Sequence, residues 1–319
     1  MDDHSFRLGD HGRYVAPSYI MTNKKRNNWL RISLRTALLL FVLVSISVGV
    51  WSSRSIKQRK TVAAVEKLGG VVSYIDNDPS RFTKTVAKWL GPDFAYDVWS
   101  VDLGGTEASD DDIRIFTNLP SVTTISLWKT AVSGDGIAYL IRLKKLHSLE
   151  LGFTEVTNDS LSHVGTLTSL RYLGLNSAKR IDDEGIQFLS GLENLERIAL
   201  WNTGTSDNGL EAISKLPKLR VLIAGGTQIS DSSTKHLRNN ETLEEIVLQR
   251  TGIGDETMLN LSSIPNLTKL TISETNISDI GLESLAKCSK LTNLSINNTS
   301  VTADGLEMIK SRLPKTKVR

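Results

Sequence analysis

Hydrophobic positions recur along most of this chain with a period of 24 residues. Within each unit three apolar residues are spaced as L-x-x-L-x-L, and further apolar positions follow 10, 15, 18 and 21 residues after the first one. The alternating positions predict a short strand, and the later three-residue spacing predicts a helix. Nine units follow this pattern, with one interval of 25 residues. They begin at Val98, Val122, Leu146, Leu170, Leu195, Leu219, Leu243, Leu267 and Leu291.

A single unit of this length cannot enclose a core of its own, so we expect the nine units to stack and share one continuous core. Burial of each large apolar side chain is worth roughly 1.5–3 kcal/mol. The pattern therefore predicts an α/β solenoid over residues 98–319, in which every unit contributes one strand, one turn and one helix.

Polar residues repeat with the same period. Threonine stands eight residues after the first apolar position of every unit except the fourth, where Ala178 replaces it. A buried hydroxyl needs a hydrogen-bond partner, so these threonines are expected to bond the turn backbone between adjacent units. Ser or Thr followed by Asp stands where the helices are expected to begin, as in ISDIGL, and such residues satisfy free N–H groups there. The expected threonine ladder comprises Thr106, Thr130, Thr154, Thr203, Thr227, Thr251, Thr275 and Thr299.

The phrase L-x-x-L-x-L-x-x-T-x-V-T-D-x-G-L resembles a leucine-rich repeat, with threonine where the commonest versions carry asparagine or cysteine. Its T-D-x-G-L ending is similar to the cysteine-containing subtype found in ubiquitin-ligase adaptors and in many bacterial repeat proteins. The resemblance implies a right-handed β/α horseshoe with parallel strands on the concave face and helices outside. It also implies that the concave face binds a protein or a peptide.

A second feature is an uncharged stretch of 18 residues between Arg35 and Arg54, rich in Leu and Val. It predicts a single transmembrane anchor over residues 29–53, which contacts the membrane through residues 36–53, with Trp29 and Trp51 as interface anchors. The 35 residues ahead of it and the lack of an A-x-A site favour a retained segment over a cleaved signal peptide, although cleavage or a buried helix stays open. Five basic residues before the stretch and four after it favour an extracytoplasmic repeat domain.

The remaining segments follow from composition. Residues 1–28 are polar and are expected to form a flexible tail, and residues 54–60 are expected to form a juxtamembrane linker. Residues 61–97 are expected to form an N-terminal cap, with a helix in VAAVEKLGG, a strand in VVSYI and an amphipathic helix in RFTKTVAKWL. A brief closing strand is expected around Val318.

Charge excludes one class of partner. Residues 1–60 carry 11 Lys or Arg against 3 Asp, whereas residues 98–319 carry 23 Lys or Arg against 27 Asp or Glu. The basic charge therefore flanks the expected membrane segment, and the repeats have no basic surplus that would favour nucleic acid. The sequence does not indicate an oligomeric state.

Catalytic and metal-binding patterns are weak. The five histidines show no H-x-x-x-H spacing, and Cys288 occupies a position that is apolar in other units, so it is expected in the core. Asp110, Asp111 and Asp112 have the oxygen ligands of a cation site, but they coincide with an expected helix start, which explains them without a metal. We therefore expect no enzymatic activity, no cofactor and no metal.

Side chains between the inward strand positions are free to bind a partner. In units two to seven they form an apolar and aromatic patch, which we expect to be the binding surface because Trp and Arg dominate binding energies. The extra residue of the fourth unit is expected to carry Lys179 and Arg180 toward the rim, where they are either partner contacts or a tolerated insertion. The expected patch comprises Trp128, Glu150, Phe153, Tyr172, Arg197, Trp201, Val221, Ile223 and Val247.

The leading hypothesis is a non-enzymatic, membrane-tethered recognition module that binds a protein or peptide on its concave face. One alternative is an intracellular adaptor similar to the ubiquitin-ligase repeat proteins, and another is a passive envelope scaffold, which would need no concentrated binding patch.

Overall fold

The structure is a computed structural model that describes residues 33–75 and 80–319. The chain divides into two compact units, Met1–Gly49 and Val50–Arg319. The flexible tail expected over residues 1–28 lies outside the described residues. The larger unit contains the whole repeat array and is considered first.

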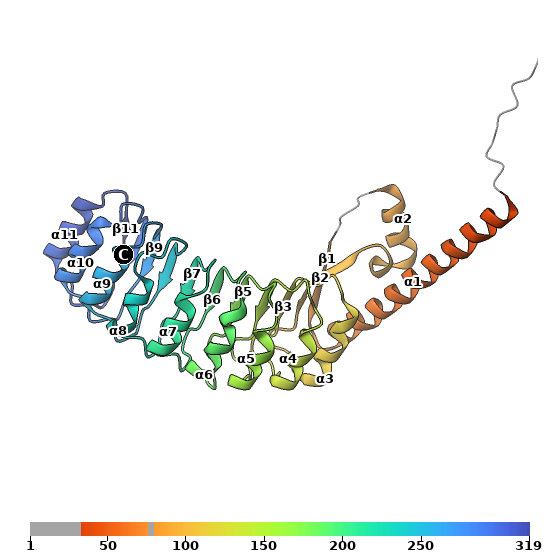
Figure 1. Cartoon of the computed structure of the whole chain (residues 1–319), viewed down its shortest axis with the longest axis horizontal. Coiled ribbons are helices and arrows are strands. Elements are labelled where there is room, and N and C mark those ends of the chain that lie inside the picture. Colours follow the sequence, from red (N-terminus) through yellow and green to blue (C-terminus); the bar gives the residue numbers. More distant parts are fainter. Residues whose placement is uncertain (1–32, 76–79) are drawn as a thin grey trace, which may run out of the picture. The chain divides into compact units, whose positions relative to one another are not determined.

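One sheet of 11 strands runs through the larger unit in sequence order (Figure 1). Strand β1 is antiparallel to β2, and each later strand is parallel to its neighbour. The closing strand expected at Val318 is confirmed as β11. The strands are β1 (Val71–Ile75), β2 (Asp97–Asp102), β3 (Thr124–Ser126), β4 (Ser148–Glu150), β5 (Tyr172–Gly174), β6 (Arg197–Ala199), β7 (Val221–Ile223), β8 (Glu245–Val247), β9 (Lys269–Thr271), β10 (Asn293–Ser295) and β11 (Lys317–Val318).

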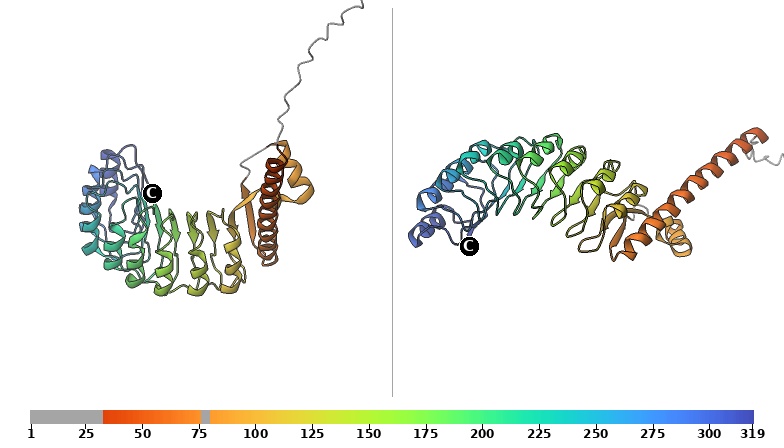
Figure 2. Two further views of the ribbon diagram at one scale, coloured as in Figure 1. Left: turned by 45° about the vertical axis from the view of Figure 1, so that its right-hand side comes forward. Right: turned by 90° about the horizontal axis from the view of Figure 1, so that it is seen from below.

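The helices that follow the strands lie on the outer side of the array, and the strands line its inner side (Figures 1 and 2). Each unit therefore has the expected order of strand, turn and helix. The helices of the repeats are α3 (Asp110–Ile113), α4 (Gly134–Leu140), α5 (Asn158–Val164), α6 (Asp183–Gln187), α7 (Asp207–Ser214), α8 (Asp231–Thr234), α9 (Asp255–Leu261), α10 (Asp279–Ser284) and α11 (Ala303–Arg312). Short 3₁₀ helices extend four of them, at Arg114–Asn118, Phe188–Gly191, Lys235–Leu237 and Leu285–Lys287.

The core is continuous because equivalent residues of successive strands stand opposite one another. Ile125 pairs with Leu149, which pairs with Leu173, and all three are fully buried. The column continues to Leu294 without a polar residue. Cys288 is also buried, as expected, and burial raises the pKa of its thiol to about 11.

Each of the strands β2 to β10 is followed by a turn that contains a left-handed residue. The residue seven positions after the start of every unit has a positive φ, and it is glycine only at Gly105 and Gly226. In the other units the turn is tight enough to hold a side-chain-bearing residue in this less favourable region. The remaining seven are Lys129, Phe153, Ser177, Asn202, Arg250, Glu274 and Asn298.

The threonine that follows this residue closes the turn of its own unit, so the predicted bonds between units are wrong. Thr154 Oγ1 donates to the Leu151 carbonyl at 2.6 Å, and Thr203 Oγ1 donates to the Leu200 carbonyl at 2.9 Å. The other threonines donate to the equivalent carbonyl. The left-handed residue brings each hydroxyl back toward its own strand, and backbone bonds such as Phe153 N–H to the Asn176 carbonyl, 2.8 Å, join the neighbours instead.

Aspartates at the helix starts make the polar contacts between units. Asp255 accepts hydrogen bonds from the N–H and the hydroxyl of Ser278 in the next unit, at 2.8 and 2.6 Å. Each carboxylate therefore satisfies free N–H groups of the following helix rather than of its own. The expected capping by Ser or Thr is confirmed at Ser230, Ser278 and Thr302, whose side chains accept hydrogen bonds from N–H groups of their own helices. We call this set the carboxylate ladder: Asp110, Asp183, Asp207, Asp231, Asp255 and Asp279.

The glycine of the D-x-G-L phrase makes room for the ladder. An added Cβ at Gly305 would collide with the carboxylate of Asp279, and one at Gly136 would collide with that of Asp110. Unit three receives no carboxylate, because Gly134 stands at the ladder position of the preceding unit. In unit three the Ser160 hydroxyl caps its own helix by accepting the Thr157 N–H at 2.9 Å. Gly136, Gly209, Gly281 and Gly305 thus leave room for the neighbouring carboxylate. At the same position Ser233 and Thr257 instead donate hydrogen bonds to Asp207 and Asp231, each at 2.6 Å.

The N-terminal end of the array is covered by β1 and by the part of α1 (Leu34–Lys67) that belongs to the larger unit. Val62 and Val65 of α1 join the core, and the buried Gln58 donates to the Tyr96 carbonyl at 2.7 Å. The linker expected over residues 54–60 is not a separate connector, because those residues continue α1 and pack on the array. The amphipathic helix expected in RFTKTVAKWL is α2 (Arg81–Leu90), but all of its side chains remain at least partly exposed.

The smaller unit contributes the apolar part of α1, where every described residue up to Gly49 is exposed. By length and composition, α1 is the one helix among the described residues that could cross a membrane. A signal sequence near the N-terminus would meet the same criterion, so the anchor itself remains a proposal.

Because Asp207 belongs to the carboxylate ladder, its protonation makes the stability of the array depend on pH. Partial burial alone would raise the pKa of this carboxyl, but hydrogen bonds from the Ser230, Ser232 and Ser233 side chains and the Ser230 N–H outweigh burial and lower the pKa to about 2. The ionised form therefore stabilises the fold above the ordinary value of 3.8, and this contribution is lost as the pH falls toward 2. We expect Asp207→Asn to lower the free energy of unfolding by roughly 1 kcal/mol at pH 7, less than the shift alone implies because the site is largely solvated.

Urea unfolding of the detergent-solubilised chain at several pH values measures this effect, and the difference from wild type should shrink between about pH 4 and pH 2. The control is Asp304→Asn in α11, because among the described residues no hydrogen bond joins the Asp304 carboxylate to another unit. Its effect should stay within about 0.5 kcal/mol. Equal losses in the two variants would contradict a role for the contact between units.

Gly305 provides a second test of the carboxylate ladder. Alanine in place of a helical glycine normally stabilises a protein by about 0.5–1 kcal/mol, but Gly305→Ala should instead destabilise the array because its Cβ collides with Asp279. In the Asp279→Ala background the same substitution should become stabilising. Urea midpoints of the four chains in this cycle test the sign change, and a destabilising effect in both backgrounds would show that the carboxylate is not the obstacle.

Candidate functional site

The most exposed aromatic side chains of the concave sheet are Trp128 and Phe153, which leave the turns after β3 and β4. Their ring centroids lie 5.5 Å apart with the ring planes at 73°, an edge-to-face pair. Trp128 is 41% exposed and Phe153 is 51% exposed. The pair therefore stabilises itself while leaving both rings accessible to a partner.

Lys129 adds a cation to this pair. Its Nζ lies 6.0 Å from the centre of the Trp128 ring, at the outer limit of a cation–π contact. Lys129 was not among the expected patch residues, although it stands seven residues after the start of its unit, as Phe153 does. This shared position was the available signal, since Phe153 was expected in the patch.

Glu150 and Tyr172 lie next to the pair but are engaged with each other. The Tyr172 hydroxyl donates to the Glu150 carboxylate, whose second oxygen accepts the Gly152 N–H at 2.9 Å. Gly174 leaves space for this carboxylate, since an added Cβ would collide with it. Partial burial, the hydrogen bond to Glu150 and its charge raise the pKa of Tyr172 above its usual range. These two residues form a fixed polar floor beside the aromatic pair.

The expected patch is less exposed toward the C-terminus. Trp201 is half-buried, and its ring lies against Gly225 of the next unit. Val221, Ile223 and Val247 are likewise half-buried, whereas Arg197 is exposed. The structure thus brings the predicted residues onto one sheet face, but the freely accessible aromatic surface is concentrated at units two and three.

Lys179 and Arg180 are both exposed in the longer fourth unit. Arg180 lies 3.2 Å from Glu155 of the preceding unit, with both side chains largely solvated. An ion pair of this kind contributes little to stability, about 0–1 kcal/mol. A role for these residues in contacting a partner stays a proposal.

Comparison with known proteins identifies the array. A family model described as a leucine-rich repeat matches residues 263–286, which span one period of the pattern. The nine stacked units repeat the same strand, turn and helix. The chain is a leucine-rich repeat protein. A search of curated proteins finds no match to its sequence.

Two solved structures from Listeria monocytogenes are similar to the leucine-rich repeat array. One is an internalin (inlF) with 12% sequence identity and a TM-score of 0.37, covering 74% of this chain and 93% of that chain. The other is internalin C2 (inlC2), with 17% identity and a TM-score of 0.43, covering 74% of this chain and 92% of that one.

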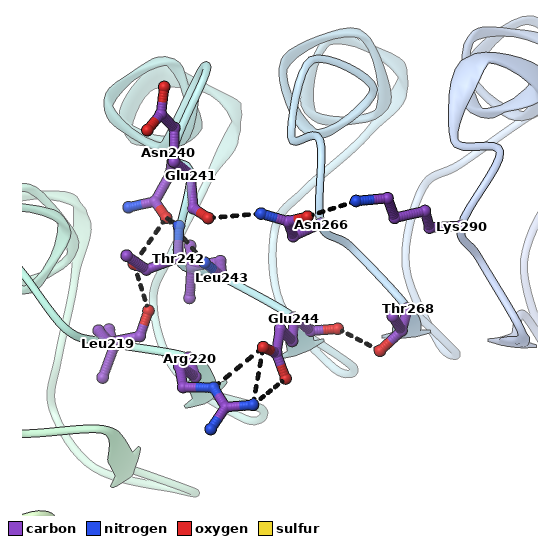
Figure 3. A network of polar contacts seen from close by, with 10 residues as sticks. All are labelled: Leu219, Arg220, Asn240, Glu241, Thr242, Leu243, Glu244, Asn266, Thr268 and Lys290. Atoms are coloured by element: carbon purple, nitrogen blue, oxygen red, sulfur yellow. Dashed lines mark hydrogen bonds and ion pairs between the residues drawn. The ribbon is translucent and has the colours of Figure 1, made fainter.

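A polar network occupies the loops that enter the strands of the leucine-rich repeats (Figure 3). Arg220 forms a bidentate pair with Glu244, at 3.0 and 2.8 Å, and Lys290 donates to Asn266 at 2.6 Å. A shallow cleft of about 340 Å³ lies here, lined by residues including Lys218, Arg220 and Glu244. Because its charged groups satisfy one another, this rim is a weaker candidate site than the aromatic pair.

The acidic run at the first unit is accounted for by helix capping. Asp110 accepts from Ser133 of the next unit at 2.7 and 2.6 Å, and Asp112 accepts from the Ser109 N–H at 2.9 Å. Over residues 33–75 and 80–319, no group of three His, Cys, Asp or Glu side chains is placed to hold a metal ion.

The engagement of Glu150 with Tyr172 can be tested by titration. We expect Glu150→Gln to lower the pKa of Tyr172, because the ionised acceptor that disfavours the tyrosinate is replaced by a neutral amide. The tyrosinate absorbance of each chain is compared with that of the matched chain carrying Tyr172→Phe, which isolates this one tyrosine. An unchanged titration would contradict the hydrogen bond.

Proposed function

We propose that this chain is a membrane-tethered recognition module whose concave face binds a protein or a peptide. The observation that carries the proposal is the accessible pair of Trp128 and Phe153 on the inner sheet. Curved repeat arrays present extended concave surfaces of this kind for binding. The function proposed is non-enzymatic.

The chemistry of the patch favours a ligand with an apolar side chain flanked by negative charge. The edge-to-face rings supply apolar area, and Lys129 supplies a cation beside them. Rigid aromatic anchors of this type dominate the energetics of protein interfaces. The Glu150 and Tyr172 floor is already satisfied internally, so it fixes the shape of the surface rather than recruiting charge.

The tether is supported by the apolar part of α1, which is exposed over its described length. A solvated helix of this composition is unfavourable in water, and about 20 apolar residues suffice to span a bilayer. An extracytoplasmic repeat domain remains part of the proposal. A passive scaffold would have no need for accessible aromatic rings, which favours recognition over that alternative.

The experiment is affinity capture with the full chain from detergent-solubilised native membranes, followed by quantitative mass spectrometry. We expect the double variant Trp128→Ala, Phe153→Ala to lose capture of the partner by at least about 30-fold, because truncation of interface anchors typically costs 2 kcal/mol or more. Folding should be unaffected, since both side chains are substantially exposed.

Phe188→Ala is the matched control, because this phenylalanine is 47% exposed but lies in a 3₁₀ helix of the outer side. A partner that is kept by this control and lost by the double variant supports the concave site. Equal capture by all three chains would place recognition elsewhere on the molecule.

A further inference from the structure

Helix α2 has an apolar face that the rest of the larger unit leaves uncovered. Phe82 and Trp89 are each 78% exposed, and Leu90 is 49% exposed. Phe82, Val86 and Trp89 recur at spacings of four and three residues, so they project from one side of the helix. Three adjacent large apolar side chains on a ten-residue helix form a patch that water solvates poorly.

The other side of α2 is basic. Arg81, Lys84 and Lys88 recur at spacings of three and four residues and are all exposed. No Asp or Glu lies in the helix to offset these three charges. Aromatic and aliphatic residues opposite Lys and Arg are the composition of helices that lie in the interface of an anionic bilayer.

Contacts within the larger unit hold α2 close to the end of the apolar stretch. The helix packs on the 3₁₀ helix η1 (Pro92–Phe94), and the Phe94 ring meets the Trp51 ring edge-to-face at 5.7 Å between centroids. Thr83 of α2 and Trp51 also line the same cleft, of about 250 Å³. Trp51 is the last apolar residue before Ser52 and Arg54, which is where a spanning segment would leave the bilayer.

We propose that α2 lies in the headgroup region of the membrane as a second contact, with Phe82 and Trp89 at the acyl boundary and its basic side chains against anionic lipid phosphates. The inference rests on the proposed tether, which brings α2 to the bilayer. It adds a lipid-binding surface to the cap, and a bilayer rather than a protein is its partner. Two observations favour a bilayer as the partner. Trp51 contacts Phe94 of η1, on which α2 packs, and the charged side chains of α2 are all basic.

The test uses the full chain reconstituted into vesicles of phosphatidylcholine, with and without phosphatidylglycerol. A polarity-sensitive fluorophore is attached through Phe82→Cys, and in a separate control chain through Phe188→Cys. The native Cys288 does not compete, because it is 4% exposed and burial raises the pKa of its thiol to about 11. Lipids with brominated acyl chains then quench any fluorophore at the acyl boundary.

At position 82 we expect a blue-shifted emission that brominated lipid quenches, and at position 188 neither effect. Quenching at position 82 should decrease when phosphatidylglycerol is omitted, and also when Lys84→Glu and Lys88→Glu are added. A blue shift without quenching would show that protein covers α2, and equal signals at both positions would show that water surrounds it; either result overturns the proposal.

Flotation of the vesicles after alkaline washing separates this proposal from the tether. A chain that floats with its vesicles but shows no quenching at position 82 retains the tether and loses the α2 contact. A chain that does not float refutes both.

Discussion

Hydrogen bonds from six of the repeats to an aspartate of the preceding repeat are the constraint on which the outer side of the array depends. Asp255 and its equivalents cap the following helix. The residue beside each carboxylate either leaves it room, as Gly281 does, or donates a hydrogen bond to it, as Ser233 and Thr257 do. Where no carboxylate arrives from the preceding unit, as at Ser109 and Thr157, the helix is capped by its own Asp112 or Ser160. Unit nine carries Ala303 at the ladder position and so has no ladder carboxylate. Because each unit satisfies its neighbour, cooperativity extends from one repeat to the next.

The inner side is organised by the turn that ends each strand. A left-handed residue and a threonine that bonds its own strand reverse the chain within a few residues, while backbone bonds join successive turns. The side chains at and next to the left-handed position are consequently displayed on the concave surface without being required by the core. Trp128 and Phe153 occupy these places, so their identity is free to serve binding, and replacing them leaves the stacking contacts intact.

The repeat boundaries, the strand order and the buried column from Val101 to Leu294 were predictable, because a 24-residue period and apolar spacing encode them directly. The hydrogen-bond partners of the polar side chains were not predictable. Spacing alone shows that Thr154 and Asp255 recur, but whether each bonds within its unit or across the stack depends on the backbone angle of the turn and the offset between neighbours. The same limit applies to the site: Trp128 and Trp201 occupy equivalent positions, and each lies against a glycine of the next unit, Gly152 or Gly225. Trp128 is nevertheless 41% exposed beside Phe153, whereas Trp201 is half-buried. The amphipathic spacing of α2 was visible and assigned the helix to the cap, but it did not indicate that Phe82 and Trp89 stay exposed.

Exposed aromatic residues gather in two places on the larger unit, and their neighbours suggest different partners. Beside Trp128 and Phe153 there is one lysine and a fixed carboxylate floor, a mixed environment suited to the varied surface of a protein. Beside Phe82 and Trp89 there are three basic residues and no acid on the helix, which suits a uniform anionic surface. On the outer helices, by contrast, Leu259 and Ile280 are exposed singly, as is ordinary for soluble surfaces. If both proposals hold, the cap meets lipid through α2 while the inner sheet at units two and three meets a protein, so recognition would take place within a few repeats of the membrane.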